Sequence, residues 1–109
     1  MSIRLYVWQR LTAALLAPLV LVHIAVIFYA MRRGLTATDI LSRTHGSVAW
    51  AAFYGTFVLA AAIHGSIGVR NVLAEWSPLS GRAAGIAAAL FGALLIVLGW
   101  RAVAAVVLS

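Results

Sequence analysis

The chain contains no cysteine, so it has no disulfide, no thiolate metal ligand and no cysteine ligand for an iron–sulfur cluster. It also lacks lysine, because all eight basic residues are arginine, and its only acids are Asp39 and Glu75. Charged residues make up 9% of the chain, against roughly 25% in soluble domains. A chain of 109 residues that is 65% hydrophobic could not bury so much apolar surface by itself, and we expect lipid around most of it.

The net charge of +6 raises the question of nucleic-acid binding. The arginines stand at the ends of apolar runs instead of clustering along one face, as a nucleic-acid interface would require. This placement suits lipid headgroups or an acidic partner subunit. We therefore expect no nucleic-acid partner.

Three apolar runs predict transmembrane helices at about residues 11–31, 46–69 and 83–106, each long enough for the roughly 20 residues that a span needs. The polar segment around Asp39 predicts a short connection with one amphipathic turn. Arg101 interrupts the third run, and we expect its side chain to snorkel to the surface while the helix continues. The predicted fold is all-α: one integral membrane domain over residues 1–109, forming part of a larger helical bundle.

The first run could also be read as a signal peptide, since Arg4 and Arg10 precede it. It is longer than the usual apolar region of about 7–15 residues, and no clear small-residue cleavage site follows it. Pro18 lies inside this run and predicts a kink. The arginines do not decide the orientation, because four flank each predicted membrane face, namely residues 4, 10, 70 and 82 against 32, 33, 43 and 101.

Two histidines, His23 and His64, lie within the predicted spans, where ionisable side chains are rare and indicate function. The simpler interpretation is an imidazole hydrogen-bonded to a neighbouring helix. Neutral imidazole is also a good iron ligand. Gly68 follows His64 by one helical turn and would leave room for a macrocycle, which Phe53 and Phe57 could flank. The spans contain no acid, which counts against a proton pathway.

The expected depths of the two histidines differ. His23 lies thirteen residues beyond Arg10, roughly 20 Å along a helix, whereas His64 lies six residues before Arg70, roughly 9 Å from the same surface. A mismatch of about 11 Å is too large for two ligands of one iron. Either each histidine belongs to a different haem or only one is a ligand, and in both cases the second ligand must come from another chain.

The stretch from His64 to Trp76 resembles the second transmembrane helix of the small membrane-anchor (cytochrome b) subunits of succinate dehydrogenase and fumarate reductase. That family has a haem-ligating histidine, a glycine four residues on and an acid eleven residues on, followed by an aromatic residue. Here these are His64, Gly68, Glu75 and Trp76. The segment at residues 8–13 resembles the arginine-centred quinone motif that precedes helix one.

His23 has no counterpart in the single-haem anchors and resembles the distal ligand of the di-haem anchors, which are single chains of five helices. The resemblance therefore implies haem b at His64, with His23 as the ligand of a second haem if there are two. The resemblance also implies a quinone site formed by Arg10, Glu75, Trp76 and Tyr6. From its position we expect His45 to begin the second predicted helix as an interfacial residue near a haem propionate, and we expect Arg70 near a propionate as well.

The resemblance further implies flavoprotein and iron–sulfur subunits as partners, and succinate chemistry would belong to them, since this chain is not catalytic for succinate by itself. A second anchor chain, identical or distinct, would complete the membrane domain. The location would be the bacterial inner membrane, with a cytoplasmic N-terminus. The alternatives are a haem-free structural anchor and a small membrane transporter.

Overall fold

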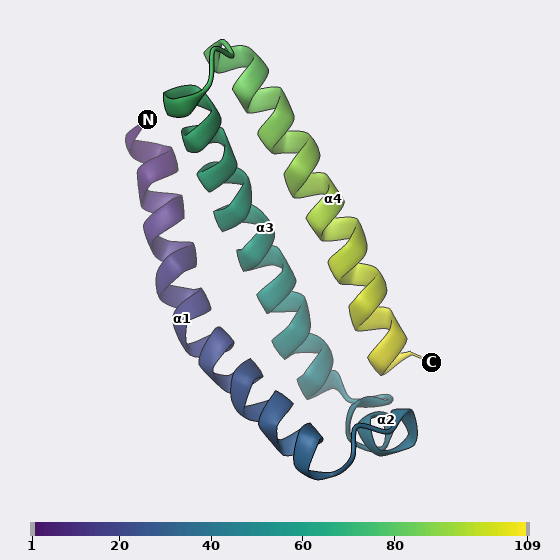
Figure 1. Ribbon diagram of the computed structural model, residues 1–109. Coiled ribbons are helices and arrows are strands. Elements are labelled where there is room, and N and C mark those ends of the chain that lie inside the picture. The colour runs from purple at the N-terminus through teal and green to yellow at the C-terminus, as the bar shows by residue number, and fades with distance from the viewer. Residues whose placement is uncertain (1, 109) are drawn as a thin grey trace.

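The computed structural model describes residues 2–108, and this part of the chain is helical with short connections (Figure 1). The helices are α1 (Ile3–Arg32), α2 (Ala37–Thr44), α3 (Val48–Trp76) and α4 (Gly81–Val107). The three long helices have the length and apolar composition needed to cross a membrane. The predicted all-α fold with three spans is therefore confirmed, and the chain is a multi-pass membrane protein.

The helices are longer than the apolar runs that predicted them. α1 begins at Ile3 instead of residue 11, and α3 continues to Trp76 instead of ending at residue 69. Apolar runs mark only the part of a helix that lies in hydrocarbon, whereas backbone hydrogen bonding continues through polar residues until a cap ends it. Here every described helix begins with a side-chain hydroxyl that accepts a hydrogen bond from a backbone N–H of the first turn. These hydroxyls belong to Ser2, Thr36, Ser47 and Ser80.

Two local expectations are confirmed and one is wrong. The turn expected around Asp39 is the short helix α2, and α4 continues through Arg101 to Val107. His45, however, does not begin the next helix as predicted. It is the C-terminal cap of α2, and Ser47 caps α3, because a hydroxyl is a better acceptor for the first N–H groups.

α3 is the central helix of the bundle, with α1 and α4 packed along it, and α2 lies against the end of α4 (Figure 1). Small residues bring α3 and α4 close together. A Cβ atom added to Gly99 would lie 2.6 Å from Cγ1 of Val58, and one added to Gly92 would lie 3.1 Å from Cβ of Ser66. The Ser66 hydroxyl donates to the carbonyl of Ala88 at 2.8 Å, which adds a polar contact to this packing.

The turn after α1 is a Schellman motif. The Leu35 N–H donates to the Ala30 carbonyl at 3.1 Å and the Gly34 N–H donates to the Met31 carbonyl at 3.3 Å. Gly34 has a φ of +99°, which a residue without Cβ adopts at little cost. The chain is therefore turned sharply from α1 into α2.

The segment around α2 closes the C-terminal end of α4. The Thr44 hydroxyl donates to the Val106 carbonyl at 2.6 Å, and the Gly46 N–H donates to the Val107 carbonyl at 2.7 Å. These bonds satisfy carbonyls that the end of a helix leaves unpaired. The connection between α1 and α3 is thereby fixed to α4.

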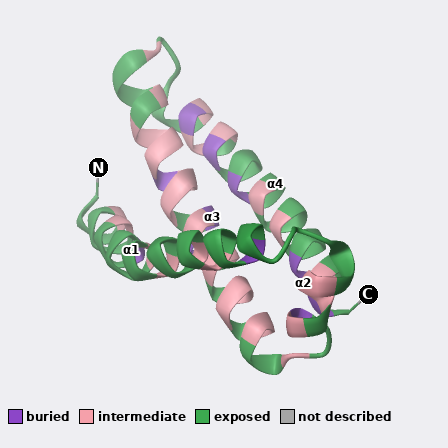
Figure 2. Ribbon diagram, turned by 60° about the horizontal axis from the view of Figure 1, so that its bottom comes forward, coloured by how far each residue is buried: buried purple, intermediate pink, exposed green. Residues whose placement is uncertain are grey.

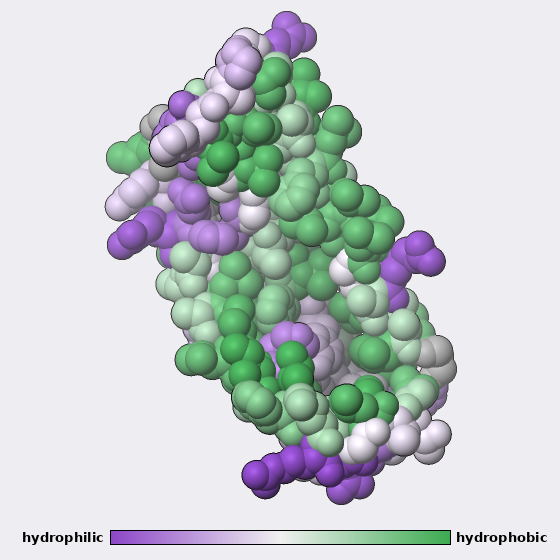
Figure 3. Space-filling model, in the orientation of Figure 1, coloured by the Kyte–Doolittle hydropathy of each residue, from purple (hydrophilic) through white to green (hydrophobic). Residues whose placement is uncertain are grey.

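Much of the apolar surface remains exposed. In α1 only Thr12 and Ala30 are buried, and most of the helix is exposed (Figure 2), including many of its large apolar residues. The space-filling view shows a broad hydrophobic surface, with hydrophilic residues at the top and bottom and further groups on the left and right edges (Figure 3). This distribution is what a lipid bilayer requires of the surface in contact with it. α1 also bends midway, in keeping with Pro18 inside it.

Candidate functional site

His64 lies at the contact between α3 and the first half of α1. Its Nδ1 atom is 3.2 Å from the backbone carbonyl oxygen of Gln9 and 3.2 Å from the hydroxyl oxygen of Thr12. Thr12 is 5% exposed, so this contact is inside the protein. The histidine therefore bridges two transmembrane helices, as the simpler interpretation of the sequence expected.

These contacts decide which ring nitrogen of His64 carries the proton. A carbonyl oxygen can only accept, so the short distance to Gln9 requires a proton on Nδ1. The Thr12 hydroxyl donates to the Trp8 carbonyl at 2.7 Å, which leaves its lone pairs free to accept from the same imidazole. The lone pair of a neutral His64 is then on Nε2. Histidines that bind metals are commonly arranged in this way, with Nδ1–H donating to a carbonyl.

Beside His64 there is space that no other part of the described chain fills. A hollow of about 560 Å³ is lined by His64, Gly68, Val72 and Phe91 together with three neighbouring residues of α3. A Cβ atom added to Gly68 would meet no atom within 4 Å. The room expected next to His64 is therefore present. The aromatic flank expected there is not, because Phe57 instead packs its ring edge-on with His23.

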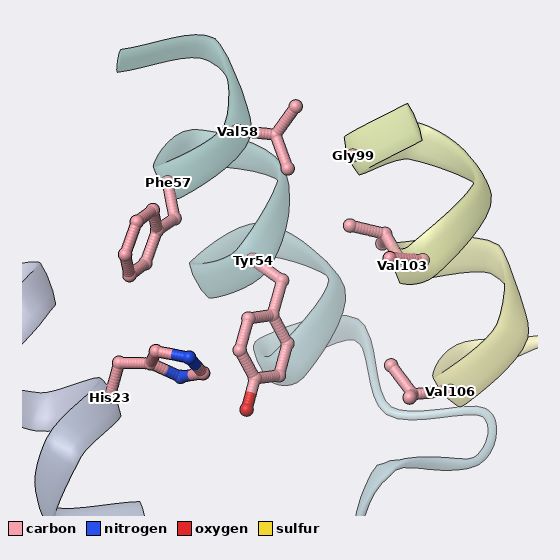
Figure 4. A pocket seen from close by; sticks show the side chains of 8 residues that line it. His23, Tyr54, Phe57, Val58, Gly99, Val103 and Val106 are labelled. Carbon is pink, nitrogen blue, oxygen red and sulfur yellow. The ribbon is translucent and has the colours of Figure 1, made fainter. Parts of the chain in front are cut away.

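His23 has different surroundings. Its ring lies edge-on to those of Tyr54 and Phe57, with centroids 5.8 and 5.3 Å away, and its Nδ1 atom is buried without a hydrogen-bond partner (Figure 4). It lines a second hollow of about 330 Å³, which Gly99 and Val103 of α4 close on the other side. No carbonyl orients this imidazole as Gln9 orients His64.

The two histidines contact the partner helix at different levels. His64 meets α1 at Gln9 and Thr12, whereas His23, eleven residues beyond Thr12, meets α3 at Phe57. Eleven residues correspond to roughly 16 Å of helix. This agrees with the depth difference expected from the sequence, and the two cannot bind one iron within a chain. Of the two histidines, only His64 has a ring nitrogen within hydrogen-bond distance of a backbone carbonyl in the described contacts.

The expected quinone residues share one end of the molecule without forming one cluster. The start of α1 and the end of α3 lie together (Figure 1). The Arg10 guanidinium lies 5.8 Å from the centre of the Tyr6 ring. Glu75 and Trp76 are exposed, Trp76 by 83%, and within residues 2–108 Glu75 forms no ion pair with Arg10. Glu75 lies eleven residues past His64, roughly 16 Å nearer the end of the bundle.

The two residues expected near haem propionates lie at opposite ends. The Arg70 side chain passes over α4, with its Nε 3.8 Å from where a Cβ of Gly85 would be, one and a half turns beyond His64. His45 is exposed at the far end, beside α2. Arg70 is at the same end of α3 as His64, but neither Arg70 nor His45 lines the hollow at His64.

Three polar residues at the α1–α3 contact were not predicted as site residues, although they lie within the segments 8–13 and 64–76 that carry the resemblance. Thr12 and the Gln9 carbonyl hold His64, and the Asn71 amide donates to the Gln9 side-chain oxygen at 3.4 Å. The spacing could have indicated them. Gln9 and Thr12 share one face of a helix, and Asn71 follows His64 by two turns on the same face.

Comparison of the chain with models of protein families, with curated proteins and with solved structures gave no match. Within the described residues, no three histidine, cysteine or acidic side chains lie close enough together to hold a metal ion. A metal at His64 would therefore need further ligands from a cofactor and from a second chain.

Proposed function

We propose that this chain is a haem b-binding membrane anchor of the succinate dehydrogenase and fumarate reductase type. It would pass electrons between an iron–sulfur subunit and quinone. The observation that supports this most is the bond between His64 Nδ1 and the Gln9 carbonyl oxygen, which leaves Nε2 free on an imidazole inside the membrane.

Each residue at His64 has a role in this proposal. Gln9 and Thr12 orient the ring and hold the proton on Nδ1, so that Nε2 would be the atom that binds the iron of a haem. Gly68 leaves one side open for a planar group, and Arg70 can pair with an acidic substituent toward the surface. Haem, when bound, supplies reversible one-electron transfer. A further ligand for the iron would come from another anchor chain, either a second copy or a distinct small subunit.

The end of the bundle beyond His64 would face the partner subunits. Arg10 donates to a quinone carbonyl, while Tyr6, Glu75 and Trp76 border the same end (Figure 1). Flavoprotein and iron–sulfur subunits would bind there and carry out the succinate chemistry. By resemblance this face is cytoplasmic at the bacterial inner membrane.

The main competitor is a structural anchor without haem, in which the bond to Gln9 only joins two helices. A small transporter is less favoured, because the described spans offer no buried carboxylate to carry a proton or cation. The test is to purify the full chain with its partners from the native membrane and record the reduced-minus-oxidised spectrum. The proposal is supported if a b-type absorption band and a flavoprotein co-purify with the chain. A colourless preparation eliminates it.

A further inference from the structure

The hollow at His23 is a second polar feature inside the membrane, and the proposed haem site does not use it. It lies between α1 and α4 over the central helix, where His23, Tyr54 and Phe57 face Gly99 and Val103 (Figure 4). Among the closely packed helix pairs of the described chain, α1 and α4 do not pair with each other, so the groove between them opens toward the lipid. The space-filling view shows such a hollow, with hydrophilic side chains at its floor and hydrophobic ones around it (Figure 3).

The burial of His23 Nδ1 determines what this imidazole can offer. This atom is shut away without any hydrogen-bond partner. A buried N–H without an acceptor is rarer than an unpaired acceptor, so the proton belongs on Nε2, at the tip of the ring. Nε2–H then needs an acceptor, because His23 lies nine residues before Arg32, roughly 14 Å from that surface and beyond easy reach of water.

The shape of the hollow limits the size and charge of what could supply that acceptor. Its volume of about 330 Å³ is at the lower end for ligand pockets, which suits a head of one or two rings and not a macrocycle. Tyr54 and Phe57 offer ring faces and edges to a flat group. Arg43 lies near the other side of Tyr54, bonded to Asp39 at 2.7 Å, and does not line this hollow, so no charged side chain lines it to hold an ion.

From these observations we infer that the His23 hollow binds the head of a flat, uncharged, lipid-soluble carbonyl compound of the quinone class. Its carbonyl oxygen accepts from His23 Nε2–H, and the ring lies against Tyr54 and Phe57. An apolar tail leaves through the groove between α1 and α4. This site is at the opposite end of the bundle from Arg10, and it does not depend on haem at His64.

Trp50 provides a local reporter, because its ring stacks on that of Tyr54 with centroids 5.5 Å apart. The experiment uses the full chain in detergent, with the other three tryptophans, Trp8, Trp76 and Trp100, replaced by phenylalanine. Menadione, a two-ring quinone, is titrated while Trp50 fluorescence is recorded, and 2-methylnaphthalene serves as the ring without carbonyls.

We expect saturable quenching by menadione and at least a tenfold loss of affinity in His23→Phe, with no displacement of menadione by 2-methylnaphthalene. Thr56→Val is the matched control, since Thr56 is exposed on α3 at the same level, and it should bind as before. Equal affinity in His23→Phe overturns the inference. If His23→Phe loses its helical circular dichroism, menadione is added to ¹⁵N-histidine-labelled unaltered chain. A shift of the His23 Nε2 resonance supports the site and no shift overturns it.

The outcome is separable from the proposed function. Haem content at His64 is read from the absorption spectrum of the complex, whereas this titration uses the chain without haem. A second haem bound through His23 would contradict the inference while leaving the proposed function intact.

Discussion

His64 Nδ1, on α3, lies 3.2 Å from the backbone carbonyl oxygen of Gln9 on α1. This relationship joins α1 to α3 and leaves the second ring nitrogen available to a ligand. His23 has the opposite arrangement, with Nδ1 buried and unpaired. Two histidines that look alike in the sequence are thus prepared for different chemistry.

If His64 binds haem iron as proposed, Thr12 should tune the midpoint potential of that iron. Thr12→Val removes the hydroxyl beside His64 Nδ1 while keeping the shape of the side chain, so the imidazole becomes less basic. We expect haem to be retained with an affinity about tenfold lower, and the midpoint potential to rise by tens of millivolts, on the order of the ~59 mV that corresponds to a tenfold change. Redox titration measures this. Thr12→Ser should keep the original midpoint potential. A midpoint potential in Thr12→Val equal to that of the unaltered chain would contradict the role of the Thr12 hydroxyl.

Substitutions of Gly99 and Gly55 should show where the packing of the helices requires a glycine. Gly99→Ala places a methyl group against Val58, and we expect a loss of about 1–3 kcal/mol in the free energy of unfolding. Gly55→Ala meets open space and should stabilise α3 by about 0.5–1 kcal/mol. Thermal melting in detergent, followed by circular dichroism, compares the two. Equal melting temperatures would show that the Gly99 contact does not limit packing.

Gly68 tests the room beside His64. A Cβ atom at position 68 meets no atom within 4 Å, so we expect Gly68→Leu to fold, with the rest of its side chain in the hollow where haem is expected. We expect melting like that of the unaltered chain together with a several-fold lower haem content. Haem content that stays unchanged would place the macrocycle elsewhere.

Asp39 should titrate unusually low. The guanidinium of Arg43, at 2.7 Å, and then that of Arg33, at 2.9 Å, hold the pKa of this carboxyl below its ordinary value of 3.8. Its contribution to stability is therefore present above pH 3.8 and is lost as the pH falls through the lowered folded-state pKa. Carboxyl ¹³C NMR follows the titration. Arg43→Gln should move the pKa upward, and an unmoved value would contradict the assignment of this ion pair.

The sequence predicted the class of fold because that class depends on few features. Twenty apolar residues in a row specify a membrane helix, and the runs that ended near Arg32 and began near Gly46 were long enough to be unambiguous. The exact ends of the helices were not predicted. Ser2 and Ser47 each cap a helix through a single hydrogen bond, and a serine that acts as a cap cannot be told from any other serine in the sequence.

The candidate site was only partly predictable. Spacing along one helix identified His64 and Gly68, since both lie on α3. The partner of His64 depends on how α1 is rotated and shifted against α3, and apolar runs that are hydrophobic all round carry little information on rotation. Gln9, which contributes a backbone carbonyl, could not be recognised from its side chain.

The measurement that tests the account most directly compares His64→Ala with His23→Ala in the purified complex. Reduced-minus-oxidised spectra are recorded at equal amounts of this chain, and helicity is checked by circular dichroism. Because His64 is the proposed haem ligand, we expect His64→Ala to lose the b-type band and His23→Ala to keep it in full. A band that survives in His64→Ala, or that disappears in His23→Ala alone, would contradict it.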